Sequence, residues 1–189
     1  MRYQRHICSG IYLVALALFF CSASCAVAQR ADSPEVSRLL SQAKTAALLA
    51  DNDAAAMDTF AYSKLSGQSK ALELDSMKEH VNNLGKVHKQ LTDARAEGSP
   101  WQQEAIDRID PLLRDLAAQI NSTINYLNDM NKNQSKANSE QYLNYTHANA
   151  DLTGRMADMI RDFVEYGKAK SKAEALSRKL ELPTSGTGQ

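Results

Sequence analysis

Three polar side chains interrupt apolar helical faces and are the best candidates for chemistry in this chain. Asp53, His80 and Asn149 each fall on or beside a seam of apolar residues. Counting back from the expected turns, at a rise of about 1.5 Å per helical residue, places Asp53 opposite His80, with Gln119 and Asn149 within about one turn. A carboxylate beside an imidazole in a helical core can hold a metal ion, orient a base or bind a polar ligand.

A structural role explains the same three residues without any ligand. Buried polar side chains fix the register of coiled coils by hydrogen bonding across the core. The layer around Asp53 holds one histidine, and the chain has no Glu-x-x-His pair of the kind that di-iron bundles use. We therefore predict no metal site, and keep Asp53, His80 and Asn149 as the residues that would bind a metal or a small ligand.

A b-type haem is the other core ligand that the sequence allows. His80 or His88 would supply one axial ligand and a methionine the other. Four methionines occupy inward positions of the expected helices: Met57, Met77, Met156 and Met159. Flexible thioether side chains more commonly fill gaps in helical cores. We therefore predict no resident cofactor and keep haem as an alternative.

The chain lacks the sequence signatures of common catalytic machineries. It has no G-x-S-x-G, Walker loop, H-E-x-x-H or glycine-rich nucleotide turn, and no defensible Ser/His/Asp spacing. Its three cysteines, Cys8, Cys21 and Cys25, all fall within the first 28 residues. Removal of that segment would exclude thiol catalysis, cysteine–zinc sites and haem attachment through C-x-x-C-H. We predict that the protein is not an enzyme and has no catalytic residues.

Residues 1–28 have the pattern of a secretory signal peptide. Arg2 and Arg5 form a positive head, an apolar run follows from Ile7, and small residues end in an A-x-A pattern at Ala28. We predict cleavage after Ala28 and a periplasmic or secreted protein. Two alternatives stay open. Residues 7–28 would be an inner-membrane anchor if uncleaved, because about 20 apolar residues span a bilayer, or Cys25 would carry a lipid.

The mature chain is close to electrically neutral. Removing the leader takes Arg2 and Arg5 from 22 basic residues and leaves all 22 acidic ones, so the net charge becomes about −2. We therefore expect no nucleic-acid partner, and membrane contact only through an uncleaved leader. Residues 29–182 suffice for one domain without disulfides, and residues 183–189 are predicted to be a disordered tail.

Apolar spacing predicts four long helices separated by short connections. They cover about residues 34–64, 69–97, 99–130 and 140–182. Helices joined in this way favour an all-α, up-down-up-down antiparallel four-helix bundle. The last helix is the longest, so its final turns overhang the others and either extend free or pack on a partner.

Local signals define the helix ends. Ser33 is a good N-cap for the first helix, and Gly67 is expected to stop it. Ser99-Pro100-Trp101-Gln102 combines a cap, a first-turn proline and a glutamine placed to reach back, which is a capping-box arrangement. Pro111 falls on an outward position of the third helix, where a kink is tolerable.

Seven-residue spacing defines the expected core of each helix. The first contributes Val36, Leu39, Ala43, Ala46, Ala50, Met57 and Phe60. The second contributes Leu74, Met77, Val81, Leu84, His88 and Leu91. The third contributes Ile106, Ile109, Leu113, Leu116, Ile120, Leu127 and Met130. The fourth contributes Tyr142, Tyr145, Leu152, Met156, Met159, Phe163, Tyr166, Ala173 and Leu180.

Aromatic and basic residues suggest further binding features. Trp101 is expected to plug one end of the bundle, or to mark a docking point if it faces solvent. The aromatic side chains of the fourth helix either stack on a ring-shaped ligand or pack in the core. The C-terminal part of that helix is rich in lysine and arginine, which suits the negative end of the helix dipole and could also bind an anionic surface.

Two phrases of the sequence carry a resemblance. They are Glu79-His80-Val81-Asn82-x-x-Gly85-Lys86 and the segment 99–109, which reads Ser-Pro-Trp-Gln-Gln-x-Ala-Ile-Asp-Arg-Ile. Both resemble phrases of exported bacterial helical-bundle proteins without assigned activity. The resemblance covers about a fifth of the chain and implies a bacterial, periplasmic protein, but it supplies no functional residues.

The sequence thus favours an exported interaction or scaffold protein of the cell envelope. The absence of catalytic motifs and the length of the fourth helix indicate action through a helix face or the overhanging end, on a protein partner of the envelope. The alternative is a bundle that binds a small ligand, a metal or a b-type haem around Asp53 and His80. The sequence does not define an oligomeric state.

Overall fold

The protein is an all-α bundle of four long helices. A computed structural model describes residues 30–62, 67–132 and 139–181. The helices are α1 (Pro34–Ala61), α2 (Gly67–Asp93), α3 (Pro100–Lys132) and α4 (Ser139–Glu181), and a short 3₁₀ helix η1 (Arg95–Glu97) precedes α3. The predicted leader, cleavage site and tail (residues 1–28 and 183–189) lie outside the described residues.

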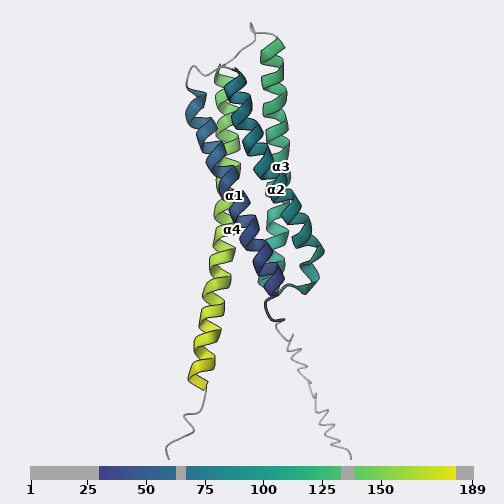
Figure 1. The fold of residues 1–189 in the computed structure, drawn as a ribbon, viewed down its shortest axis with the longest axis vertical. Coiled ribbons are helices and arrows are strands. Elements are labelled where there is room, and N and C mark those ends of the chain that lie inside the picture. The colour runs from purple at the N-terminus through teal and green to yellow at the C-terminus, as the bar shows by residue number, and fades with distance from the viewer. Residues whose placement is uncertain (1–29, 63–66, 133–138, 182–189) are drawn as a thin grey trace, which may run out of the picture.

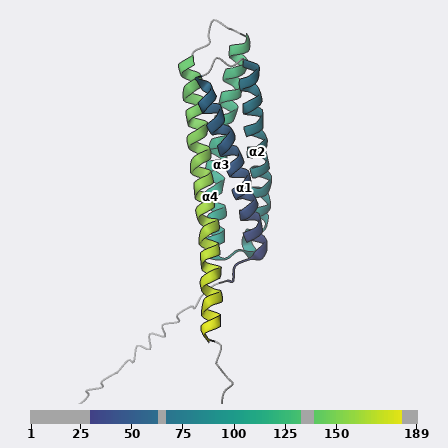
Figure 2. The ribbon, with the colours of Figure 1, turned by 60° about the vertical axis from the view of Figure 1, so that its left-hand side comes forward.

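The helices run alternately up and down, as predicted (Figure 1). In space α1 lies against α2 and α4, and α3 lies against α2 and α4, so helices that follow one another in sequence are neighbours. The two views of Figures 1 and 2 show α4 continuing past the ends of the other three helices. This confirms the predicted antiparallel bundle with an overhanging C-terminal helix.

The predicted helix starts are confirmed where caps were identified. The Ser33 hydroxyl accepts a hydrogen bond of 3.3 Å from the backbone N–H of Val36, and Pro34 opens α1. Before α3, the Gln102 side chain accepts from the backbone N–H of Ser99 at 2.9 Å, which is the reaching-back half of a capping box. Pro111 lies inside α3 and its side chain is exposed, also as predicted.

Two predicted boundaries are wrong. Gly67 does not stop the first helix but opens α2, while α1 already ends at Ala61. The second helix ends at Asp93 rather than Glu97, because the chain must leave the helical conformation before Pro100, and residues 95–97 tighten into η1. Arg95 of this turn holds Asp107 of α3 through two hydrogen bonds of 2.7 and 2.6 Å.

The core follows the predicted seams in α1, α2 and α3. Alanines dominate the buried face of α1 and allow close approach of α2 and α4: Ala43, Ala46, Ala47, Ala50 and Ala54. Leu113 and Met130 of α3 are half-buried rather than enclosed. Phe60 is a clear exception, because 43% of it is exposed at the end of α1, where the heptad rule had placed it inside.

The predicted seam of α4 is displaced from the real one. The buried side chains of this helix are Tyr142, Thr146, Asn149, Thr153, Met156, Ala157, Ile160 and Val164. Phe163 is half-buried and Tyr166 is 53% exposed, although both were expected in the core, and Leu180 is 86% exposed in the predicted overhang.

Threonine chemistry explains this displacement. The Thr153 hydroxyl donates to the Asn149 carbonyl at 2.9 Å, and the Thr146 hydroxyl donates to the Leu143 carbonyl at 2.9 Å. Both hydroxyls also reach carboxylates of α1, Thr146 to Asp58 at 2.8 Å and Thr153 to Asp51 at 3.3 Å. A threonine whose hydroxyl is bonded in this way fills a core position with its methyl group. The larger apolar side chains of α4 are therefore left at the edge of the bundle, facing α3, and beyond its end.

No helix in the described ranges is long and apolar enough to cross a membrane.

Candidate functional site

The Asp53–His80 pair forms where the sequence placed it. His80 Nε2 on α2 lies 3.4 Å from Asp53 Oδ2 on α1. The two side chains are 28% and 25% exposed, so the pair sits at the margin of the core rather than at its centre. It joins the two helices across one face of the bundle.

Asn149 belongs to a different pair of helices. It is fully buried on α4, and its Nδ2 donates to the Thr123 hydroxyl of α3 at 3.1 Å. That hydroxyl in turn donates to the Gln119 carbonyl at 2.9 Å. The three residues predicted as one group therefore make separate contacts, Asp53 with His80 and Asn149 with Thr123.

The other core candidates have packing roles. Met57, Met77 and Met156 are at most 1% exposed and belong to the continuous apolar core. Among the described residues, no group of three or more histidine, cysteine, aspartate or glutamate side chains could hold a metal ion. Five buried side-chain atoms nevertheless have no hydrogen-bond partner in the described part of the chain: Asp53 Oδ2, which has only the ion-pair contact with His80, His88 Nε2, Ser99 Oγ, the Tyr142 hydroxyl oxygen and Asn149 Oδ1.

The aromatic residues of α4 divide into two groups. Tyr142 and Tyr145 pack around Tyr126 of α3, with ring centroids 6.3 and 5.3 Å away. Burial, with Glu73 nearby, raises the pKa of Tyr142 to about 12, so this hydroxyl stays protonated at neutral pH. Phe163 and Tyr166 lie near Trp101 at the other end of the helix, so the four rings cannot surround one ligand.

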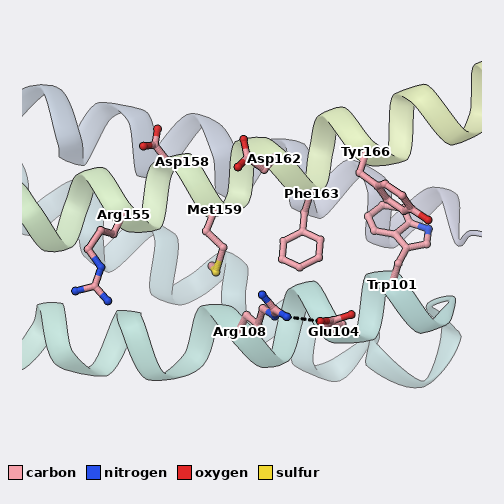
Figure 3. A pocket seen from close by; sticks show the side chains of 9 residues that line it. All are labelled: Trp101, Glu104, Arg108, Arg155, Asp158, Met159, Asp162, Phe163 and Tyr166. Atoms are coloured by element: carbon pink, nitrogen blue, oxygen red, sulfur yellow. Dashed lines mark hydrogen bonds and ion pairs between the residues drawn. The ribbon is translucent and has the colours of Figure 1, made fainter.

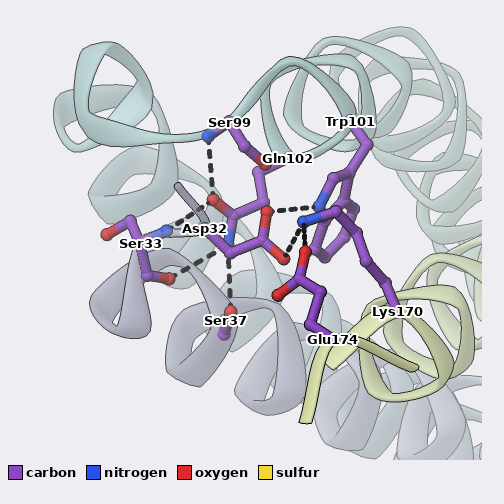
Figure 4. A network of polar contacts seen from close by, with 8 residues as sticks. All are labelled: Asp32, Ser33, Ser37, Ser99, Trp101, Gln102, Lys170 and Glu174. Atoms are coloured by element: carbon purple, nitrogen blue, oxygen red, sulfur yellow. Dashed lines mark hydrogen bonds and ion pairs between the residues drawn. The ribbon is translucent and has the colours of Figure 1, made fainter. Parts of the chain in front are cut away.

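A buried polar network joins the starts of α1 and α3 (Figure 4). The Gln102 side chain accepts from the backbone N–H groups of Ser33 and Ser99, and it donates to the Ser33 carbonyl and the Ser37 hydroxyl, each at 2.9 Å. Gln102 is fully buried. The capping-box pattern predicted its bond within α3 but gave no sign of its three bonds to α1.

Asp32 extends this network to α4. Its carboxylate accepts from Trp101 Nε1 at 2.7 Å and from Lys170 Nζ at 3.1 Å, and Lys170 also pairs with Glu174 at 2.8 Å. Burial raises the pKa of Asp32, but polar contacts from Ser99, Lys170 and Trp101 outweigh it and hold that pKa below its usual value. No sequence pattern marked Asp32, because its partners are 69 and 138 residues away.

Trp101 closes this end of the bundle, as predicted, and packs on α4. Its indole meets the Tyr166 ring edge-on, with centroids 5.5 Å apart. It also covers Gly167 so closely that a Cβ atom there would lie 2.6 Å from Trp101 Cη2. The glycine therefore allows the indole to lie against the backbone of α4.

Beside Trp101, a groove of about 720 Å³ runs between α3 and α4 (Figure 3). Trp101, Met159, Phe163 and Tyr166 form its apolar surface. Charged residues surround that surface: Glu104, Arg108, Arg155, Asp158 and Asp162. Arg108 pairs with Glu104 at 2.6 Å and lies over the Phe163 ring, 5.8 Å from its centroid. An apolar surface with a charged border suits an amphipathic segment of another molecule.

The apolar surface continues along α4 beyond the bundle. Every residue from Ser171 to Leu180 is exposed. The apolar members recur at three- and four-residue intervals and so lie on one side of the helix: Tyr166, Ala169, Ala173, Leu176 and Leu180. Together with Met159 and Phe163 of the groove, these five residues form what we call the docking face.

Comparison of the chain with protein-family models, with curated proteins and with solved structures found no match. The resemblance of residues 79–86 and 99–109 to exported bacterial bundle proteins therefore stays a prediction.

Proposed function

We propose that this is an exported interaction protein of the cell envelope that binds a protein partner through the docking face and performs no catalysis. The observation that carries the proposal is the continuity between the groove and the overhang. A seam that begins half-buried against α3 runs on past the end of the bundle, where Leu176 is 51% and Leu180 86% exposed.

Burial of this seam would favour association. A leucine side chain removed from water contributes about 1.5–3 kcal/mol, and two such residues one turn apart form a compact apolar anchor. The overhang keeps its helical form as an extension of a packed helix, aided by the Lys170–Glu174 pair at its base. A preformed helix loses less conformational entropy on binding than a flexible segment.

Capture from an envelope extract tests the proposal. The bait would be the wild-type protein, a Leu176→Glu/Leu180→Glu variant, or a Leu72→Glu control, since Leu72 is 64% exposed on α2. We expect a partner that wild type and the control retain, that the double variant loses, and that binds in the same way when purified. Identical retention by all three baits would contradict the proposal.

The export part of the proposal is supported by the charge, apolar and small-residue order of residues 1–28. N-terminal analysis of the protein recovered from its host tests it. We expect the chain to start at Gln29. A native product that retains residues 7–28 would instead favour the membrane-anchored form. A lipid attached to Cys25 would favour the lipoprotein form.

A core ligand site is the alternative function, supported by the buried atoms Asp53 Oδ2, His88 Nε2 and Asn149 Oδ1, which lack hydrogen-bond partners among the described residues. Unsatisfied buried polar atoms are uncommon and can mark a place for water or a ligand. Natively purified protein would then carry a metal or a visible absorption band that an Asp53→Ala/His80→Ala variant loses. A colourless, metal-free preparation would contradict this alternative.

A further inference from the structure

We propose that the docking face binds a second copy of this chain, with the two α4 helices antiparallel and each overhang lying in the groove of the other copy. The inference rests on the proposed function, because it names the occupant of the same face. Three features of α4 carry it: the matched lengths of overhang and groove, a charge row that reverses sign along the helix, and the spacing of the apolar residues.

The lengths of overhang and groove correspond. The overhang from Ser171 to Glu181 is 11 residues long, and the α4 side of the groove runs from Arg155 to Tyr166. At about 1.5 Å per residue both segments measure about 16–18 Å. A two-fold axis crossing α4 between residues 168 and 169 would therefore lay each overhang along the whole groove of its partner.

The charges along α4 favour antiparallel pairing of the two helices. A row at seven-residue spacing carries Asp158 and Glu165 beside the groove and Lys172 and Lys179 on the overhang. The two carboxylate side chains are 63% and 53% exposed, and both lysines are exposed; Asp158 also pairs with Arg161 at 2.7 Å and Glu165 with Lys168 at 3.0 Å, so each carboxylate would be shared with the lysine of the second copy. Within the part of the chain that the structure describes, neither lysine has an ion-pair partner.

Antiparallel pairing about that axis makes this row self-complementary. Lys179 of one copy comes opposite Asp158 of the second copy, and Lys172 comes opposite Glu165, so symmetry gives four attractive pairs. Parallel pairing would instead bring like charges together at all four positions. Charges that flank an apolar seam set the orientation of paired helices in this way.

The same register brings apolar residues together. Leu176 of one copy lies within two positions, about 3 Å along the helix, of the level of Met159 of the other, and Leu180 lies equally near the level of the aliphatic stem of Arg155. Tyr166 and Ala169 meet near the axis, where the small side chain gives the ring room and allows close approach of the helices. The half-buried Phe163 lies about one turn from the level of Lys170, and the long aliphatic stem of this lysine continues the apolar contact.

Sedimentation velocity over a concentration series tests the pairing. We expect wild type and Leu72→Glu to form dimers, and Leu176→Glu/Leu180→Glu to stay monomeric. Asp158→Lys/Glu165→Lys and Lys172→Glu/Lys179→Glu should each raise Kd about tenfold or more, because each reverses four pairs. The variant with all four changes should regain a Kd near that of wild type. Circular dichroism confirms that each variant is folded.

Zero-length carbodiimide cross-linking tests the register. Lys179 and Asp158 are separated by 21 positions on one helix, about 31 Å, so a direct link between them must join two molecules. We expect links between residues 179 and 158 and between 172 and 165, and their loss in the Leu176→Glu/Leu180→Glu variant. A dimer without these links would overturn the proposed register.

The outcomes separate this inference from the proposed function. A monomeric wild type whose docking face captures a different protein would overturn the inference and leave the function standing. A dimer that Leu176→Glu/Leu180→Glu does not weaken would overturn the inference by placing the interface elsewhere. A monomer that captures nothing through this face would overturn both.

Discussion

At the end of the bundle where α1 and α3 begin, single residues connect segments that are far apart in sequence. Gln102 bonds to both Ser33 and Ser99, Asp32 bonds to both Trp101 and Lys170, and Gly167 admits the Trp101 ring. These contacts set the height at which α4 leaves the bundle, and with it the position of the docking face. Three substitutions test them one at a time.

Gln102→Ala should destabilise the protein by about 2–4 kcal/mol, because it leaves the Ser33 N–H and the Ser99 N–H buried without partners and removes one of the two hydrogen bonds to the Ser33 carbonyl. The neighbouring Gln103 is a matched control. It makes one bond, to the Gly98 carbonyl at 2.9 Å, so Gln103→Ala should cost about 1 kcal/mol or less. Urea unfolding followed by circular dichroism measures both. Equal losses would contradict the role of Gln102 as a link between helices.

Gly167→Ala should lower Tm although alanine is the better helix former. Its Cβ would meet two atoms of the rigid Trp101 ring at 2.6 and 2.9 Å, and such overpacking costs about 1–3 kcal/mol. Gly85 is the control, because a Cβ there meets nothing within 4 Å. Gly85→Ala should raise stability by about 0.5–1 kcal/mol. A thermal scan in which both variants gain stability would show that Trp101 does not pack on α4.

Asp32→Asn should reduce stability in a pH-dependent way. The pKa of Asp32 is lower in the folded state than its usual value near 3.8, so its stabilisation is complete above that value and is lost as the pH falls through the folded pKa. The difference between wild type and variant should be about 1–3 kcal/mol at neutral pH and should shrink in acid. Asp93→Asn, which breaks an exposed pair with Lys89, is the control. A difference that does not change with pH would contradict the assignment.

At the scale of the helices, the length of α4 is its most distinctive property. It has 43 residues, against 28, 27 and 33 for α1, α2 and α3. Its N-terminal part packs against α1 and α3, and its last turns contact neither helix. The two parts should therefore contribute very differently to stability.

A chain that ends at Lys170 should keep its free energy of unfolding within about 1 kcal/mol of wild type, because residues 171–180 are exposed and the Lys170–Asp32 pair is retained. A chain that ends at Arg161 should be much less stable, because it also loses the buried Val164 and the half-buried Phe163. Urea unfolding at low protein concentration compares the two. A large loss in the longer chain would mean that the overhang packs on its own bundle.

The sequence predicted the helices well and the face of α4 poorly, for a physical reason. Heptad spacing identifies Met159, Phe163, Tyr166 and Leu180 as a seam, but it does not say which molecule covers a seam. Thr146 and Thr153 read as polar, yet they occupy the core because a threonine hydroxyl can bond to its own helix.

The contacts of the candidate site were also predicted only in part. The Asp53–His80 contact followed from counting residues back from one turn, since both helices rise from that turn at a fixed rate. The contacts of Asp32 and Gln102 depend on where distant helix ends meet in space. Helix periodicity alone does not fix that meeting point.

At the scale of the whole molecule, the proposed function makes the bundle a base that presents one helix. The alanine-rich α1 lies tightly against α2 and α4, while the groove opens between α3 and α4 beside the start of the overhang. In the proposed pair, two such bases would be joined end to end by their α4 helices.

Hydrogen exchange of residues 171–180 would show whether another molecule covers the overhang, since the backbone of a lone helix exchanges quickly and that of a packed helix slowly. We expect slow exchange of this segment in wild-type protein at concentrations where it pairs, and fast exchange on dilution. The Leu176→Glu/Leu180→Glu variant should exchange quickly at every concentration. Equally fast exchange in both proteins at all concentrations would contradict the account.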